Sequence, residues 1–171
     1  MPAIVSLLFY DARSPVFSQV VPDKTLPSES RVILEQDEYQ ITGGTIAGQN
    51  LFHSFTEFSL VKGQSAYFDS PATVQNIIGR VTGLASTIDG RIRTNGSANL
   101  FLLNPNGISF GENASLEIGG SFLASTAPAL RFSDGSVFSA TPLRPALLSV
   151  NVPLGVQWGQ PSPQRSSIAG G

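Results

Sequence analysis

The chain has 171 residues, close to the usual size of one domain, so a single hydrophobic core is expected. Charged residues make up 13% of the chain, which is roughly half the usual share for a soluble globular protein, and the net charge is -2. The chain carries no block of basic residues, which excludes nucleic acids and anionic membrane surfaces as partners that would bind through charge.

Composition also limits the fold class and the chemistry. The 17 glycines and 12 prolines interrupt helices too often for a helical bundle, while 41% hydrophobic residues suffice to fill a core. The absence of cysteine excludes disulfides, thiolate nucleophiles and thiolate metal sites. No stretch reaches the roughly 20 apolar residues that span a bilayer, so no integral membrane insertion is expected.

Residues 1–18 are compatible with two interpretations. Their apolar run, residues 3–10, resembles the apolar part of an export signal, and a small-residue cleavage site fits just before Gln19. No Lys or Arg precedes the run, however, and Asp11 ends it, so a buried strand is equally compatible. A domain is expected over residues 19–158, and residues 159–171 have the composition of a flexible tail.

The first elements of the domain are predicted from short apolar runs. Residues 31–34 and 39–42 predict two strands, the second ending at Gly43-Gly44. Phenylalanines recur every third residue at Phe52, Phe55 and Phe58. Residues 50–60 therefore fit either a helical turn or a pair of strands.

The most regular part of the chain lies between residues 77 and 124. Its predicted strands are residues 77–78, 80–82, 87–88, 91–93, 99–103, 108–110, 115–118 and 121–124. The predicted turns between them are Gly79, Gly83, Asp89-Gly90, Asn95-Gly96, Asn106-Gly107, Glu112-Asn113 and Gly119-Gly120. Asn and Gly tolerate the positive φ that such frequent turns require.

Two all-β architectures fit this pattern, an antiparallel sandwich and a parallel β-helix. In a β-helix, coils of about twenty residues stack roughly 4.8 Å apart. The intervals between turns are often shorter than the 8–12 residues typical of a sandwich, and residues 77–124 lack the charges that protect sandwich edges. The pattern therefore favours the β-helix, in which Asn, Ser and Thr side chains can form ladders and Gly leaves room where coils approach closely.

A stacked fold of this kind needs a cover over the end of its apolar core. Residues 32–68 are the richest in aromatic side chains and precede the regular coils. They are predicted to form an N-terminal cap whose phenyl rings close the end of the helix. The cap residues are expected to be Asn50, Phe52, His53, Phe55 and Phe58.

Several segments resemble a known family, namely residues 49–55, 76–83, 88–90, 99–108 and 119–122, while residues 19–23 are similar to the start of its mature domain. The family is the haemagglutination-activity, or two-partner-secretion, domain of filamentous-haemagglutinin-like exoproteins, in the form common among cyanobacterial members. The resemblance implies a right-handed, single-stranded parallel β-helix with an N-terminal aromatic β cap.

The resemblance also implies a function. After export to the periplasm, the POTRA domains of an outer-membrane β-barrel transporter would recognise the domain and direct it to the cell surface. There it would serve as part of an adhesin with host or cell-surface ligands. No cofactor and no enzymatic activity are implied.

One turn carries the strongest functional signal, Asn104-Pro105-Asn106-Gly107. Pro fixes φ, Asn side chains bond to the neighbouring backbone and Gly supplies positive φ, so the four residues form a tight turn by construction. The resemblance adds a role as a secretion motif, and the two roles are compatible. The second Asn-Pro-Asn-Leu box of other family members is absent from its expected place near residues 73–76.

Other polar residues have simpler explanations. His53 is the only histidine and is flanked by Phe52 and Phe55, so packing explains it better than metal binding or base catalysis. Asp89, Arg91 and Arg93, with Arg80 about one coil away, could line a polysaccharide-cleaving site, but they also fit a turn followed by solvated arginines.

The main alternative function is carbohydrate binding or adhesion through exposed aromatic rings. After Tyr10, the amphipathic rings available for it are Tyr39, Tyr67 and Trp158, which are far apart in the sequence. Such a module would need these rings to converge on one flat sheet face.

Overall fold

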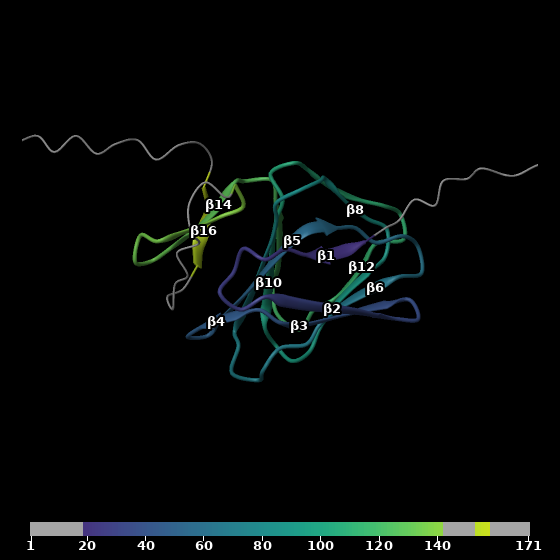
Figure 1. Cartoon of the computed structure of the whole chain (residues 1–171), viewed down its shortest axis with the longest axis horizontal. Helices are drawn as coiled ribbons and strands as arrows, with labels where there is room; N and C mark the ends of the chain where they lie inside the picture. The colour runs from purple at the N-terminus through teal and green to yellow at the C-terminus, as the bar shows by residue number, and fades with distance from the viewer. Residues whose placement is uncertain (1–18, 142–152, 158–171) are drawn as a thin grey trace, which may run out of the picture.

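The structure is a computed structural model that describes residues 19–141 and 153–157. Within these ranges the chain is all-β, and strands of successive coils stack in parallel into a β-solenoid of about four turns (Figure 1). The predicted parallel β-helix is confirmed. No helix in this part of the chain is long and apolar enough to cross a membrane. The predicted signal segment, the C-terminal tail and Trp158 lie outside the described residues.

Three sheets form the sides of the solenoid. The first sheet contains β5 (Asn50–Phe58), β7 (Asn76–Val81), β10 (Asn99–Leu103) and β13 (Phe122–Ser125). The second sheet contains β3 (Glu38–Gly43), β6 (Ser65–Phe68), β9 (Arg91–Thr94) and β12 (Ser115–Glu117). The third sheet pairs β8 (Ser86–Ile88) with β11 (Ile108–Phe110). Each coil therefore supplies one strand to each sheet it passes through.

An asparagine ladder fixes the register of the first sheet. Asn76 donates from Nδ2 to Asn50 Oδ1 over 2.9 Å, and Asn99 donates in the same way to Asn76, also over 2.9 Å. The steps along the chain are 26 and 23 residues, slightly longer than the predicted twenty. The ladder continues to the Ser121 amide, which donates to Asn99 Oδ1. Expected side-chain ladders are thus present at the start of β5, β7 and β10.

The first sheet is buried on both sides, which explains why every residue of β7 is buried. Ile77 and Val81 point into the solenoid core, whereas Ile78 belongs to a second core outside it. In β6 of the second sheet only alternate residues are buried, and these residues, Ala66 and Phe68, face the core. A strand covered on both faces loses the polar–apolar alternation that marks a half-exposed strand.

The N-terminal cap is built from antiparallel strands. β1 (Val20–Pro22) and β4 (Thr45–Ala47) pair with β5, and β2 (Ser30–Glu35) pairs with β3. The predicted strands at residues 31–34 and 39–42 are confirmed as β2 and β3. Because β2 runs against the parallel strands, it ends the parallel stacking of the second sheet.

Residues 50–58 form one continuous strand, β5, rather than the helical turn or the pair of strands that the sequence allowed. A bulge at Thr56 explains the spacing of the phenylalanines, because Val21 lies opposite Glu57 while Pro22 lies opposite Phe55. The extra residue lets both Phe55 and Phe58 point into the solenoid core. Phe52 instead lies in the second core, so it does not close the end of the solenoid as expected.

Two expectations about the turns need correction. Gly79 lies inside β7 and is not a turn, since β7 runs unbroken from residue 76 to residue 81. Positive φ is found at Gly96 and Gly107 but not at Gly119. A Cβ on Gly119 would overlap the carbonyl oxygen of Gly96, so close stacking of coils demands glycine there.

A C-terminal sheet was not predicted. It consists of β14 (Ala129–Phe132), β15 (Val137–Ser139) and β16 (Pro153–Gln157), all antiparallel. Its phenylalanines pack on the outer side of the first sheet, where the Phe52 ring lies 4.9 Å from the Phe138 ring. The dipeptide Asp134-Gly135 between two apolar runs is a sequence pattern typical of a β-hairpin and could have predicted the pairing of β14 with β15. Gly135 has a φ of 82°, as such a turn requires.

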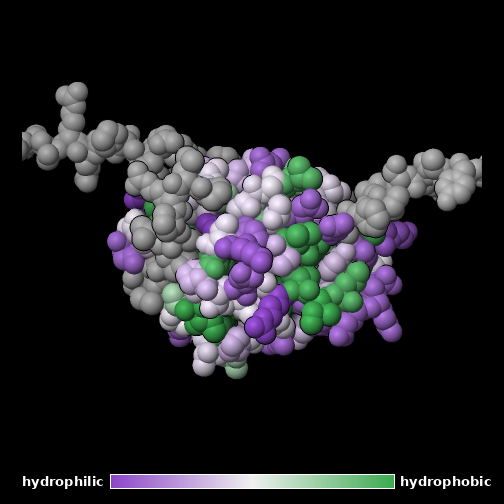
Figure 2. Space-filling model, viewed as in Figure 1, coloured by the Kyte–Doolittle hydropathy of each residue, from purple (hydrophilic) through white to green (hydrophobic). Residues whose placement is uncertain are grey.

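Some apolar side chains remain on the surface. On the face viewed in Figure 2, apolar patches are separated by polar ones. The exposed large apolar residues include Ile33 and Leu34 on β2, Ile46 on β4, and Phe110 and Leu116 on the last coil. Single exposed apolar residues are common on protein surfaces and do not by themselves indicate a binding site.

Substitution by alanine is expected to lower stability at a glycine that another coil contacts closely, such as Gly119, far more than at Gly79, which has room for a methyl group. Gly119→Ala should destabilise the protein by roughly 2 kcal/mol or more, because its methyl group meets backbone. Gly79→Ala is the matched control, since its methyl group would lie 3.5 Å from Leu102 Cδ1, an ordinary contact. Urea unfolding of both variants provides the measurement, and equal losses would contradict the stacking argument.

Candidate functional site

The turn Asn104-Pro105-Asn106-Gly107 joins β10 to β11, and its first residue is completely buried. Asn104 donates from Nδ2 to the carbonyl oxygen of Leu84 and to Ser86 Oγ, each over 2.9 Å. Both acceptors belong to the preceding coil. The side chain of Asn104 therefore ties this turn to the one stacked beneath it.

The rest of the turn is held by its own polar groups. Asn104 Oδ1 accepts from the Asn106 amide over 3.0 Å, and the Asn104 carbonyl accepts from the Gly107 amide over 3.1 Å. Asn106 is exposed and also donates from Nδ2 to the Gly83 carbonyl. Gly107 has a φ of 120°, a conformation that favours glycine. Asn104 thus acts inside the fold, while Asn106 presents the turn to solvent.

His53 lies in the solenoid core between aromatic rings. Its ring is completely buried, 5.9 Å from the Phe55 ring and 5.6 Å from the Phe68 ring. Nδ1 lies 2.9 Å from Ser30 Oγ, and Nε2 has no partner. Burial lowers the pKa of His53 to about 3, so the ring is neutral at ordinary pH.

Among residues 19–141 and 153–157, no group of His, Cys, Asp and Glu is arranged to hold a metal ion. His53 is surrounded by rings and one serine rather than by carboxylates. The geometry therefore matches the packing interpretation of this residue. The remaining cap residues divide between the asparagine ladder, which Asn50 begins, and the two cores.

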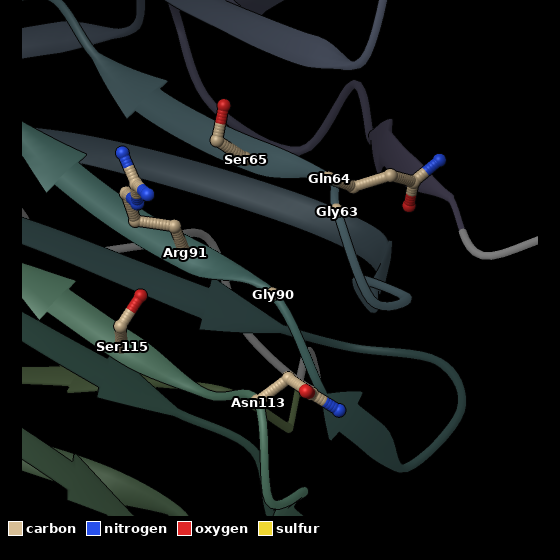
Figure 3. A pocket seen from close by; sticks show the side chains of 7 residues that line it. All are labelled: Gly63, Gln64, Ser65, Gly90, Arg91, Asn113 and Ser115. Carbon is tan, nitrogen blue, oxygen red and sulfur yellow. The ribbon is translucent and has the colours of Figure 1, made fainter.

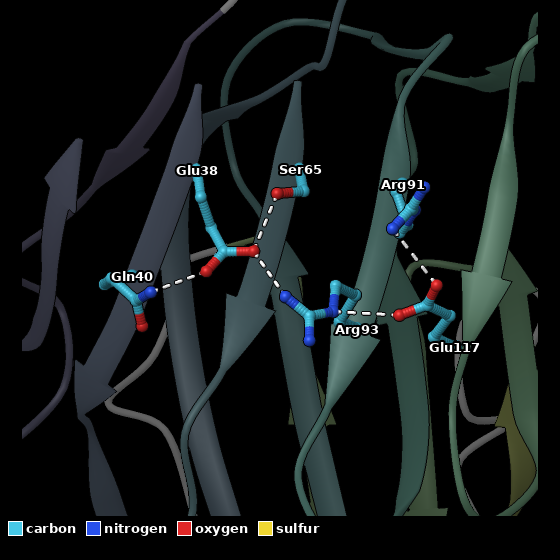
Figure 4. A network of polar contacts seen from close by, with 6 residues as sticks. All are labelled: Glu38, Gln40, Ser65, Arg91, Arg93 and Glu117. Carbon is cyan, nitrogen blue, oxygen red and sulfur yellow. Dashed lines mark hydrogen bonds and ion pairs between the residues drawn. The ribbon is translucent and has the colours of Figure 1, made fainter. Parts of the chain in front are cut away.

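The outer face of the second sheet carries a row of ion pairs across four strands (Figure 4). Arg93 pairs with Glu38 over 2.7 Å and with Glu117 over 2.9 Å, and Arg91 pairs with Glu117 over 3.1 Å. Partial burial favours the neutral form of Glu38, but hydrogen bonds from Ser65 and Arg93 hold its pKa below the usual range. The carboxylates of Glu38 and Glu117 therefore each form an ion pair with at least one arginine.

The sequence did not indicate these carboxylates. Glu38 and Glu117 are 55 and 24 residues from Arg93, and only the stacking of coils brings them to it. Asp89 lies at a turn as expected, where it accepts from the amide of Asn113 over 2.9 Å. The prediction that Arg80 lies near Arg91 and Arg93 was wrong. Arg80 belongs to β7 of the first sheet, and its side chain enters a separate polar cluster.

A shallow polar pocket opens beside the ion pairs (Figure 3). Its volume is about 190 Å³, and it is lined by Gly63, Gln64, Ser65, Gly90, Arg91, Asn113 and Ser115. Pairing between strands places Ser65, Arg91 and Ser115 in one row across three coils. The lining holds no carboxylate, whereas polysaccharide cleavage of the kind considered above requires two.

The amphipathic rings do not converge in the part of the chain that the structure describes. Tyr39 is buried in the core with 6% of its surface exposed. The guanidinium of Arg93 lies 5.2 Å from the centre of the Tyr67 ring. These two tyrosines therefore do not form the flat aromatic surface that the carbohydrate-binding alternative requires.

A buried polar cluster lies between the first sheet and the C-terminal sheet. Arg80 is 2% exposed and donates to Ser54 Oγ and Thr25 Oγ1, each over 2.8 Å, and to the Ser139 carbonyl. Ser54 and Thr25 in turn donate to the carboxylate of Asp23. Burial lowers the pKa of Arg80 while the charge of Asp23 opposes this shift. We call these five residues the Arg80 cluster.

Comparison with known proteins adds one match. The family model described as the TPS secretion domain matches residues 18–170. No curated protein matches the chain. The matched residues include the complete solenoid, the Asn104-Pro105-Asn106-Gly107 turn and the C-terminal sheet.

The buried His53 predicts a pH-dependent stability. Its pKa is about 3 in the folded protein and about 6.5 in the unfolded chain, so only the unfolded chain takes up a proton as the pH falls below about 6.5. The free energy of unfolding should drop by about 2 kcal/mol between about pH 8 and pH 5. Denaturant unfolding at each pH measures this, and His53→Gln should remove most of the slope; an unchanged slope would assign it to other groups.

The two asparagines of the turn should differ in their effect on stability. Asn104→Ala removes, at a completely buried position, the hydrogen bonds to the buried Ser86 hydroxyl and to the Leu84 carbonyl, so we expect a loss of roughly 2 kcal/mol. Asn106→Ala removes one bond at an exposed position and should cost less than about 1 kcal/mol. Thermal unfolding of both variants compares them, and a larger loss for Asn106→Ala would contradict the assignment.

Proposed function

Since the chain belongs to the TPS secretion domain family, it is part of a two-partner-secretion exoprotein, and we propose that it is the segment by which the transporter recognises its cargo. In this proposal, POTRA domains of an outer-membrane β-barrel transporter bind the domain in the periplasm and direct it to the cell surface. The observation that carries the proposal is the family match, which extends over residues 18–170.

The solenoid supports export in extended form followed by folding outside. Without cysteine, the chain crosses a pore with no disulfide to reduce. Each coil pairs mainly with its neighbours, so a coil that has emerged offers a template to the next one. Before the coils close, their strands have unpaired edges, which suit addition to the sheet edge of a POTRA domain.

Asn106 of the Asn104-Pro105-Asn106-Gly107 turn is the proposed contact for the transporter in the extended chain. Asn106 is the exposed side chain of this turn, and its loss should disturb folding least. Residues 1–18 would act as the export signal and residues 159–171 as a tail. Adhesion to host or cell-surface ligands would follow once the exoprotein has reached the surface.

Binding of the unfolded chain to purified POTRA domains tests the proposal. The wild-type chain, kept unfolded in dilute urea, should bind. Asn106→Ala should weaken binding and lower the secreted amount, whereas Glu112→Ala, at an exposed position on the same coil, should change neither. Failure of the wild-type chain to bind would refute POTRA recognition, and equal effects of the two variants would refute a role for the turn.

A further inference from the structure

The C-terminal sheet forms no backbone sheet pairing with the strands of the solenoid among the described residues. β14 pairs with β15 and β16, and none of the described residues links these strands to a solenoid strand through a sheet ladder. The successive solenoid coils, by contrast, pair along whole strands. The C-terminal sheet is therefore held to the solenoid by side chains, and units joined in this way can open before the rest unfolds.

The C-terminal sheet covers an apolar surface that would otherwise face solvent. Phe52, Ile78 and Leu103, from three stacked strands, are completely buried and belong to the second core. Phe132 and Phe138 supply the opposing side chains. If the cover opened, these five residues would expose a continuous apolar patch of the kind that binds protein partners.

Arg80 lies within this contact and bonds to two segments that are far from it along the chain. Its guanidinium donates to Thr25, 55 residues before it, and to the carbonyl of Ser139, 59 residues after it. It also lies 4.6 Å from the centre of the Phe138 ring. A buried charge of this kind is stabilised only when its hydrogen bonds are made. Arg80 therefore has all its partners only after both segments have docked.

We propose that the C-terminal sheet is a movable cover over the first sheet, that Arg80 is the latch that closes it, and that the transporter engages the open form. The last step rests on the proposed function. A chain that passes a pore in extended form brings residues 25 and 139 to the same side only when the whole segment between them has crossed. Closure of the latch then marks the end of transport and buries the apolar patch.

Hydrogen exchange of the full chain tests the cover without the transporter. In Arg80→Met and Phe138→Ala, amides of residues 129–139 should exchange at least about tenfold faster, while amides of β7 and β10 keep their protection. Phe68→Ala, in the solenoid core, is the control expected to raise exchange in both regions. Arg91→Met, in an exposed ion pair, should change neither. Parallel changes in cover and solenoid in the first two variants would overturn the proposal.

A second measurement separates this inference from the proposed function. Folded Arg80→Met, which keeps all five patch residues, should bind purified POTRA domains several-fold more tightly than the folded wild-type chain, because its cover is open more often. Equal binding would show that the cover plays no part in recognition. If even the unfolded wild-type chain fails to bind, the proposed function fails, and the exchange result alone then decides whether the latch exists.

Discussion

The whole structure depends on one constraint, that each coil lies directly on the previous one with its strands in parallel register. The spacing between strands is about 4.8 Å, so any group at a corner must either bond to its counterpart or be absent. Asn50, Asn76 and Asn99 satisfy the first condition, and Gly119 satisfies the second. The same constraint lines up Ser65, Arg91 and Ser115 outside the solenoid.

Burial of the first sheet on both sides divides the protein into two cores with different roles. The inner core is formed by stacking and contains Phe55 and His53. The outer core is formed when the C-terminal sheet docks, and it contains Phe52 together with the Arg80 cluster beside it. If the protein is exported before it folds, as proposed, these two events need not occur together. The second core is therefore the natural place to control completion of the fold.

Neighbouring residues of the Asn104-Pro105-Asn106-Gly107 turn differ in their structural role. Asn104 is buried and bonds to the preceding coil, whereas Asn106 is exposed. This division leaves one side chain of the turn available for the contact proposed with the transporter. Mutation should therefore separate the proposed contact from the fold, because the Asn106 side chain makes one hydrogen bond at an exposed position.

Local sequence was sufficient for the strands at residues 31–34 and 39–42, for most strands between residues 77 and 124, for most turns and for the parallel stacked architecture, because these depend on short apolar runs and on turn residues. It was also sufficient for the turn at Asn104, whose residue types dictate its geometry. Tertiary structure alone decided the rest. Gly79 lies inside a strand since both of its sides are covered, and Glu38 meets Arg93 only because coils 55 residues apart along the chain are stacked in space. The partners of Arg80 come from residues 25 and 139, and no local pattern encodes contacts that form only after distant segments have docked.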